Sequence, residues 1–485
     1  MKKNMFVAGL AAMLLLFNSC ATNPVTGKKD IVLMSEEQEI ALGAQTDPAV
    51  VAQFGLYEDK ALQQFIQQKG QAMAAVSHRP ELKYEFKIVD SPVINAFALP
   101  GGYVYFTRGI MAHFNNEAQF AGVLGHEIGH ITARHSVQQQ SKSTLAQIGL
   151  VAGMVLSPQL AQLGNELSQG LGLLFLKFGR DDERESDELG VEYSTKIGYD
   201  ASEMADFFLT LQRQQEGSGS AIPNFLSTHP NPADRYERVH ELAAAWKKKE
   251  NLTTAKVERN SYLKRLDGMV YGEDPRQGFV ENNVFYHPEL KFRFPIPSGW
   301  GYLNSPQVFQ MAPQDGRAMM NLMLVPGETL EAAAQTLLQT YNLQPVESKS
   351  TTVNGLPALA IVADQQPQQQ QTQQQQQVIR TLTYLIRYGG NNYSLMGITT
   401  ADDFNNYFQT FTNTMQNFAE LTEADKLNRK PERIRLYTVP QPMTLSQALQ
   451  RNNIKQDRLD EFAILNGMQL TDPVEKGTLI KVVSQ

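Results

Sequence analysis

The sequence has a single cysteine, Cys20, among 485 residues. One cysteine cannot form a disulfide within the chain, so no disulfide is expected to hold this fold. Long runs of one charge are missing too, since 43 basic residues are interspersed with 50 acidic ones and the formal charge is -7. This balance argues against the basic surface of nucleic-acid-binding proteins, and no nucleic-acid partner is expected.

Apolar runs are also short. The first, from Met5 to Phe17, follows two lysines and ends just before Cys20. That order is typical of an export signal, and the run falls short of the roughly 20 residues of a membrane span. The segment from Phe17 to Cys20 resembles a bacterial lipobox, which implies a lipoprotein signal peptide over residues 1–20 with a lipidated Cys20. A plain signal peptide with an incidental cysteine is the alternative.

A lipidated Cys20 implies that the protein meets a membrane through an N-terminal lipid anchor. Ala21, and not Asp, follows the cysteine. By the sorting rules of enterobacterial lipoproteins, this favours an outer-membrane lipoprotein that faces the periplasm. Two later apolar runs, 144–155 and 169–178, are expected to be core or lid helices, with a role at the membrane surface as the alternative.

The chain is too long for one hydrophobic core, so several domains are expected. Apolar spacing predicts helices at 35–55, 58–77, 117–134, 181–197 and 201–216, and alternation predicts strands at 83–90 and within 93–106. Residues 21–250 are therefore expected to form a mainly helical domain with a small sheet. The fold class is multidomain α+β.

Two further domains are expected after this first one. Residues 284–420 alternate as strands with helices at 328–341 and 402–420, and their FPIPSGW opening resembles PsbP-like domains. A low-complexity, Gln-rich loop at 365–377 falls where a hairpin loop belongs. Residues 434–485 show a strand, helix, helix, strand order that resembles a LysM module, although Pro440-Gln441-Pro442 replaces the usual Gly-Asp turn. The tail is expected to be either a peptidoglycan binder or a structural or protein-binding module.

The string GHEIGHITARH at 125–135 is the most specific sign of a chemical function in the sequence. His126 and His130 are four residues apart and project from one face of a helix, with Glu127 beside them. A catalytic zinc takes three protein ligands and leaves its fourth position to water. The third ligand is expected among the carboxylates of the helix at 181–197, and spacing alone does not choose between them. These candidates are Asp181, Asp182, Glu183, Glu185, Asp187, Glu188 and Glu192.

Four segments, NAFALPGG, HEIGH, RDDERESDELG and STHPNPADR, follow one another in this sequence. Together they resemble the HtpX and CAAX-prenyl-protease type of gluzincin (HExxH) zinc metallopeptidases, with an architecture closest to BepA-like periplasmic lipoprotein proteases. The resemblance covers about residues 20–245 and implies that residues 21–250 form a zincin-like catalytic domain, a zinc metallopeptidase. It implies one zinc ion per chain with Glu183 as the third ligand. Asp187, one turn later, is expected to support a ligand histidine from the second shell and fix its tautomer.

This site predicts peptide-bond hydrolysis. Zinc lowers the pKa of a bound water to about 7. Glu127 is expected to take the proton and pass it to the leaving amine. A substrate strand formed by Asn95, Ala96, Phe97 and Ala98 is expected to accept an extended polypeptide along an exposed sheet edge.

Two histidines keep more than one interpretation. His229 could donate to the oxyanion, occupy the open zinc position as an inhibitory ligand, or cap a loop. The resemblance favours a regulatory ligand, and Pro230 makes the loop stiff enough to hold that pose. His135 is expected to be structural, with a catalytic part as the alternative.

Two functions therefore stay open. The first is a zinc-dependent endopeptidase of the bacterial cell envelope that hydrolyses unfolded, misfolded or misassembled envelope polypeptides. The second is a chaperone or assembly factor that uses a latched protease fold as a binding scaffold. Glu127 favours the first, because a pure scaffold has no physical need for a general base.

Overall fold

The computed structural model describes residues 20–141, 178–217, 224–229, 234–365 and 378–485. Most of the expected signal peptide, the run 144–155, nearly all of 169–178 and nearly all of the Gln-rich loop lie outside these ranges. Within them, no helix is both long enough and apolar enough to cross a membrane.

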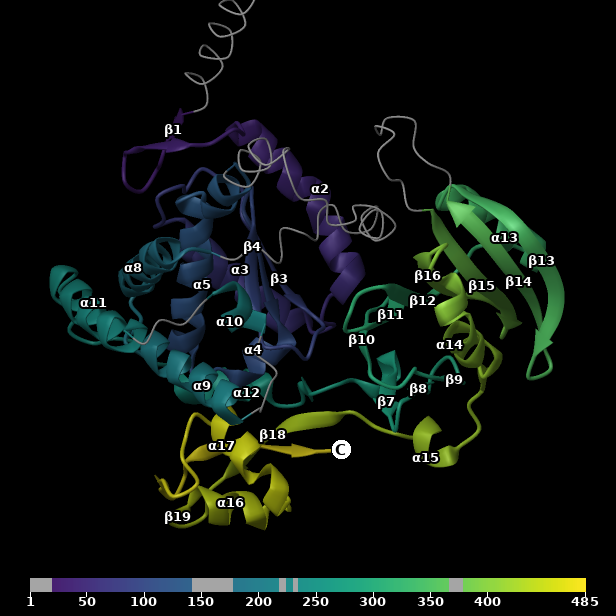
Figure 1. Cartoon of the computed structure of the whole chain (residues 1–485). Coiled ribbons are helices and arrows are strands. Elements are labelled where there is room, and N and C mark those ends of the chain that lie inside the picture. The colour runs from purple at the N-terminus through teal and green to yellow at the C-terminus, as the bar shows by residue number, and fades with distance from the viewer. Residues whose placement is uncertain (1–19, 142–177, 218–223, 230–233, 366–377) are drawn as a thin grey trace, which may run out of the picture.

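The N-terminal part of the chain builds a body of helices around a small sheet (Figure 1). The expected helices at 35–55, 58–77, 117–134, 181–197 and 201–216 are all present, with ends that differ by a few residues. The elements of this body are β1 (Cys20–Thr22), β2 (Lys29–Ile31), α2 (Glu36–Phe54), α3 (Lys60–Ala74), β3 (Glu85–Val89), β4 (Ala96–Leu99), β5 (Tyr103–Thr107), α4 (Arg108–His113), α5 (Glu117–Thr132), α8 (Arg180–Lys196), α9 (Glu203–Gly217), α10 (Asn224–Thr228), α11 (Arg235–Lys249) and α12 (Arg259–Leu266).

Local chemistry explains where these helices begin. Ser35 caps α2 in a capping box with Gln38. Asp59 accepts a hydrogen bond from the third residue of α3, and Asn116 does the same for α5. Such caps satisfy backbone N–H groups that the first turn leaves unpaired, so they fix the start of each helix.

The sheet of the body has the order β3-β5-β4, with β3 parallel to β5 and β4 antiparallel to it. One face packs against α2 through Phe97, Leu99 and Tyr105. The other face, which includes Val104 and Phe106, packs into the larger core formed with α3 and α5. This arrangement leaves β4 at the edge of the sheet, beside the helix that carries the HExxH motif.

The middle of the chain forms a separate α+β unit around a seven-stranded antiparallel sheet of order β10-β11-β12-β16-β15-β14-β13. Helix α13 covers one face, and α14 with a four-stranded sheet of order β17-β9-β8-β7 covers the other. The elements are η2 (Pro275–Gln277), β7 (Phe279–Glu281), β8 (Val284–His287), β9 (Phe292–Pro295), β10 (Trp300–Asn304), β11 (Val308–Pro313), β12 (Ala318–Leu324), α13 (Leu330–Thr340), β13 (Leu343–Val353), β14 (Leu356–Gln365), β15 (Ile379–Tyr388), β16 (Asn391–Thr400), α14 (Phe404–Gln416), β17 (Ala419–Glu420) and α15 (Ala424–Leu427).

One boundary in this unit differs from the prediction. The helix expected at 402–420 ends at Gln416, because Phe418 is fully buried in the core below and the next two residues pair with β9. Strands β14 and β15, which flank residues 366–377, pair antiparallel as a hairpin requires.

The tail has the predicted strand, helix, helix, strand order, and its first strand lies between its last strand and β6. Strand β6 (Val270–Tyr271) precedes the middle unit, and the elements of the tail are β18 (Glu432–Thr438), β19 (Met443–Thr444), α16 (Leu445–Arg451), η3 (Gln456–Arg458), α17 (Leu459–Leu465), β20 (Pro473–Val474) and β21 (Leu479–Ser484). The likeness to a LysM module stays a prediction.

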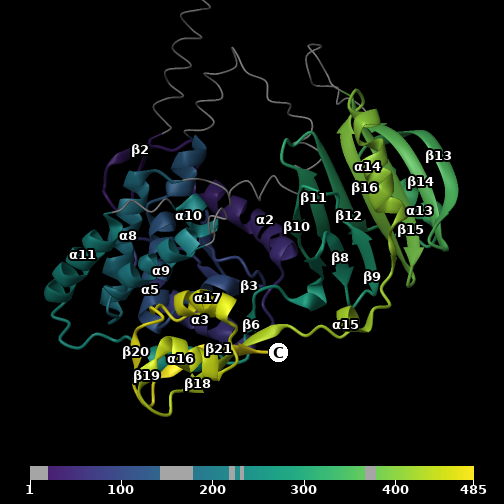
Figure 2. The same ribbon diagram turned by 60° about the horizontal axis from the view of Figure 1, so that its bottom comes forward.

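The tail packs directly on the N-terminal body (Figure 2). A single hydrophobic core contains Tyr262 of α12 together with Phe462 and Ile480 of the tail. Lys481 is fully buried at this contact and donates hydrogen bonds from Nζ to the carbonyl oxygens of Ala112 (2.7 Å) and Phe114 (3.0 Å). The described tail and body therefore share one core, which continues past the boundary expected near residue 250.

Candidate metal centre

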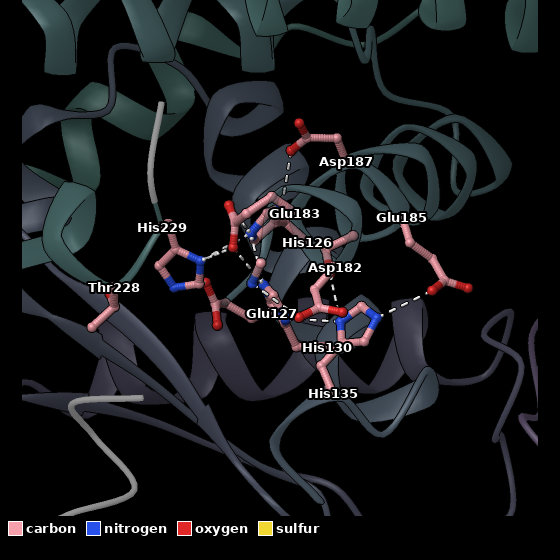
Figure 3. A network of polar contacts seen from close by, with 12 residues as sticks. His126, Glu127, His130, His135, Asp182, Glu183, Glu185, Asp187, Thr228 and His229 are labelled. Carbon is pink, nitrogen blue, oxygen red and sulfur yellow. Dashed lines mark hydrogen bonds and ion pairs between the residues drawn. The ribbon is translucent and has the colours of Figure 1, made fainter. Parts of the chain in front are cut away.

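Four side chains from three parts of the body meet in one buried cluster (Figure 3). His126 and His130 come from α5, Glu183 comes from α8, and His229 follows α10. Each is at most 1% exposed, and one ligand atom from each lies within 4.8 Å of the other three. We call this set the four-ligand cluster.

The distances show that the four groups point at a common centre. Nε2 of His126 lies 3.0 Å from Nε2 of His130 and 3.3 Å from Nδ1 of His229. Glu183 Oε1 lies 2.9 Å from Nδ1 of His229 and 3.5 Å from Nε2 of His130. Three imidazoles and one carboxylate in this arrangement are a ligand set typical of a zinc site.

Glu127 lies beside this cluster. Its side chain is 1% exposed, and neither carboxylate oxygen has a hydrogen-bond partner in the described part of the chain. Nε2 of His229 lies 3.7 Å from Oε1 of Glu127, at ion-pair distance. A buried carboxylate without hydrogen-bond partners is costly. A bound cation and its water would supply what Glu127 lacks, so the residues present fit a metal ion.

Two further side chains fix the cluster from behind. Asp187, which the sequence predicts to support one of the ligand histidines, has its Oδ1 3.0 Å from Nδ1 of His126. Arg235 donates to both oxygens of Asp187, at 2.8 and 2.6 Å, and its Nη1 lies 3.2 Å from Oε2 of Glu183. Arg235 is missing from the residues predicted as functional, although it is the last residue of the STHPNPADR segment.

Burial and neighbouring charges shift the pKa values of Glu127 and of the cluster residues, some upward and some downward. Burial, the largest influence, raises the pKa of Glu127, although His229 and His126 oppose it. Burial alone would also raise the pKa of Glu183, but nearby histidines, His229 first, outweigh it and hold that pKa well below its usual range. Burial lowers the pKa of His130 well below its usual range. Glu183 is therefore ionised and His130 neutral, as metal ligands must be.

Aromatic rings hold the histidines in place. The ring of Phe178 stacks on His130 with centroids 4.0 Å apart, and Phe225 of α10 stacks on His229 at 4.6 Å. Sequence reasoning did not single out either phenylalanine, because nothing in the spacing of the chain shows that these rings meet the motif.

The predicted substrate strand lies at the open edge of the sheet. Ala96, Phe97 and Ala98 belong to β4, and Asn95 directly precedes it. Among the described strands none pairs with the outer side of β4. The backbone N–H of Phe225 donates to the carbonyl of Ile94 at 3.2 Å, so α10 is attached at the beginning of this edge.

Two more residues were singled out in the sequence, His135 and Cys20. His135 packs beneath His130, with Nδ1 atoms 3.0 Å apart. Cys20 is the first residue of β1, and its lipidation stays a prediction.

This geometry defines a metallopeptidase-type centre, with an HExxH helix, a carboxylate from a second helix and a free glutamate. Residues 60–243 match the model of Peptidase family M48, and this segment is an M48 peptidase domain. The predicted recognition of a gluzincin metallopeptidase is confirmed for this part of the chain.

Two curated relatives are similar to part of this chain. A mitochondrial metalloendopeptidase OMA1 from Arabidopsis thaliana is 30% identical over 204 residues, which is 41% of this chain and 40% of the relative. A beta-barrel assembly-enhancing protease from Escherichia coli K12 is 31% identical over 252 residues, or 48% of this chain and 51% of the relative. The chain spans only about 40 to 51% of the length of these two relatives.

Among solved structures, cyanobacterial PsbP from Synechocystis is similar to part of the chain at 11% identity, with a TM-score of 0.23. The match covers 28% of this chain and 91% of that structure. A likeness of this size leaves the PsbP-like character of the middle unit a prediction.

Proposed function

We propose that the chain is a zinc-dependent endopeptidase of the bacterial cell envelope, which hydrolyses misfolded or misassembled envelope polypeptides. One observation carries this proposal: the buried Glu127 carboxylate, which accepts no hydrogen bond from the described residues, lies beside three imidazoles and a carboxylate that converge on one point. The similarity of residues 60–243 to M48 peptidases supports it.

Bound zinc would polarise a peptide carbonyl and acidify a water at the position that Glu127 faces. Glu127, whose pKa is raised by burial, would hold the proton of that water and deliver it to the leaving amine. Asp187 would keep Nε2 of His126 directed at the metal by accepting the proton of Nδ1. The outer side of β4 would hold the substrate in an extended conformation.

The envelope location rests on the sequence of the first twenty residues and on Cys20. If Cys20 is the lipidated residue, replacing it with Ala should move the protein from the membrane fraction to the soluble fraction. A Cys20→Ala protein that remains on membranes after a high-salt wash would contradict the lipid anchor.

The reaction is tested by separating metal binding from proton transfer. Glu127→Gln should keep one zinc per chain and lose proteolysis of an unfolded protein such as casein by about 10²- to 10⁴-fold, the usual share of a general base. Glu183→Ala should lose the zinc itself. Glu188→Gln on the same helix, outside the cluster, is the matched control and should change neither. Casein cleavage at the normal rate by Glu127→Gln would refute the mechanism.

His229 favours regulation of this site. It lies inside the four-ligand cluster and not on the surface of a loop, so it occupies a position that water or substrate would need. If His229 is an inhibitory ligand, His229→Ala should raise the rate of casein cleavage and leave the zinc content unchanged. If it is an oxyanion donor, the rate should fall by about 10²- to 10³-fold.

The position of His229 is also the observation that favours the second candidate, a chaperone or assembly factor with a latched protease fold. In that case neither the unchanged chain nor His229→Ala would cleave casein with zinc bound. Both would still suppress the aggregation of an unfolded outer-membrane protein, and Glu127→Gln would do so equally well.

A further inference from the structure

His130 offers one ring nitrogen to the four-ligand cluster and turns the other one away from it. Its Nε2 lies 3.0 Å from Nε2 of His126, inside the cluster. Its Nδ1 lies 3.0 Å from Nδ1 of His135. His126 is supported from behind by Asp187, and the corresponding position behind His130 is held by His135.

His135 continues this contact to a carboxylate. Its Nε2 lies 3.1 Å from Oε2 of Glu185, which comes from α8 and points toward the ring (Figure 3). The His135 side chain is 1% exposed and that of Glu185 is 25% exposed. The series from His130 through His135 to Glu185 therefore runs from the cluster toward the surface of the body.

Metal binding would fix the proton positions along this series. An imidazole that binds a metal through Nε2 carries its proton on Nδ1, so His130 would donate to Nδ1 of His135. His135 would then carry its own proton on Nε2 and donate it to Glu185. Ser186 Oγ lies farther from the same Nδ1, at 3.3 Å, and is a second neighbour of that atom.

A left-handed turn brings His135 under His130. Residues five apart on a continuous helix differ by about 140° in direction and do not share a face. Helix α5 ends at Thr132, and Arg134 has a φ of +60°, a conformation that costs roughly 1 kcal/mol or more for a residue with a Cβ. The chain direction changes there, and His135 returns beneath the last turn.

A buried carboxylate holds this turn. Glu39 of α2 is 1% exposed and accepts hydrogen bonds from Nε of Arg134 and Nη1 of Arg79, both at 2.8 Å. Arg134 also donates to the carbonyl of Met34 at 3.1 Å. Glu39 lies outside the segment 60–243, so this support comes from the chain that precedes the M48 domain.

We propose that His135 and Glu185 are positioning residues for the metal ligand His130, and that the contact between Glu39 and Arg134 holds His135 in that place. The inference rests on the proposed metal site, and it adds a second support beside Asp187. His135 does not touch substrate in this role. It orients the His130 ring and strengthens Nε2 as a ligand.

The test measures zinc affinity of the purified chain by competition with a chelator, and the visible spectrum of the cobalt(II)-substituted protein, neither of which needs activity. His135→Ala should weaken zinc binding by about 10- to 100-fold, the usual loss when such a support is removed, and shift the cobalt bands. His135→Asn should recover most of that loss, because Oδ1 of Asn occupies the position of Nδ1 and accepts the same hydrogen bond.

Glu185→Ala, at a position where the side chain is 25% exposed, should give a smaller loss in the same direction. Ser186→Ala and the surface change Glu188→Ala on the same helix should stay within about twofold of the unchanged chain, well short of the loss at His135. Unchanged zinc affinity and cobalt spectrum in both His135→Ala and Glu185→Ala would overturn the inference. A loss in Ser186→Ala larger than in His135→Ala would also overturn it. If the unchanged chain itself binds no zinc, the proposed function fails instead.

Discussion

At the scale of single residues, His113 at the end of α4 couples the fold to pH. It is buried, and its Nδ1 lies 2.7 Å from the carbonyl of Gly109. Burial lowers the pKa of His113 to about 4 from the usual 6.5, and the charge of nearby Lys481 acts in the same direction with a smaller effect. The folded chain therefore keeps His113 neutral at a pH where the unfolded chain protonates it.

The number of protons that each state binds decides whether the free energy of unfolding rises or falls with pH. Between pH 6.5 and 4 the unfolded state binds more protons at this position, so His113 makes the free energy of unfolding fall as the pH falls through that window, by about 3 kcal/mol in total. His113→Asn can keep a donor to Gly109 and cannot titrate. We expect its free energy of unfolding, from urea denaturation at pH 7.5 and at pH 4.5, to fall less than that of the unchanged chain. Equal falls in both proteins would contradict the prediction.

The residues of the metal centre differ in how far the sequence could reveal them. The spacing of His126, Glu127 and His130 follows from helix geometry alone, and the structure brings them together as expected. Glu183 needed the family resemblance, because seven carboxylates on the same predicted helix fit the spacing equally well. The sequence could not reveal Arg235, because its role depends on a tertiary contact. It could not reveal the role of His135 either, because that role depends on a positive φ at Arg134, a residue that is not glycine.

At the scale of elements, the packing of α5 on α8 sets the distance between the ligands. Gly190 of α8 faces α5 so closely that an added Cβ would lie 3.0 Å from the carbonyl oxygen of Gly122 and from the backbone N of His126. Backbone atoms cannot turn aside, so a methyl group here must push the two helices apart.

We therefore expect Gly190→Ala to lower the free energy of unfolding by about 1–3 kcal/mol and to weaken zinc binding as well, because Glu183 would move away from His126. Gly179→Ala, at the beginning of the same helix, is the matched control: its nearest neighbour is a side-chain oxygen of Asp182 at 3.4 Å. Thermal unfolding and chelator competition measure the two effects. Normal zinc affinity in Gly190→Ala would show that the helix spacing does not set the site.

Elements were predictable where local chemistry decides them. Apolar periodicity gave the helices of the body with ends correct to within about three residues. Local caps such as Ser35 and Asn116 explain why those helices begin where periodicity places them. The helix expected at 402–420 was too long, because its end depends on the burial of Phe418 and on pairing with β9, which local periodicity does not report.

At the scale of the whole molecule, the middle unit is an insertion into one continuous body. Strand β6 precedes it and β18 follows it, and the two strands pair antiparallel, with Tyr271 opposite Glu432 and Val270 opposite Arg433. The chain therefore leaves the body and returns to it at the same place. The sequence showed the change of character near residue 284, but it could not show that the tail shares a core with the body.

This topology predicts that the two C-terminal parts respond differently to deletion. Replacing residues 272–431 with Asn-Gly would join Tyr271 to Glu432 through a two-residue turn, which suits an antiparallel pair. We expect this shortened chain to fold, to unfold cooperatively and to bind one zinc, because the core that surrounds the metal centre stays whole.

Deleting residues 432–485 should have the opposite effect. It would expose the core face that Phe462 and Ile480 cover, and it would leave the carbonyls of Ala112 and Phe114 without the donor that Lys481 supplies. We expect a chain that aggregates or unfolds and retains little zinc, measured by size-exclusion chromatography and metal content. The opposite result would contradict this division: the tail-deleted chain would bind zinc and the chain that lacks 272–431 would not. The middle unit, and not the tail, would then belong to the folding body.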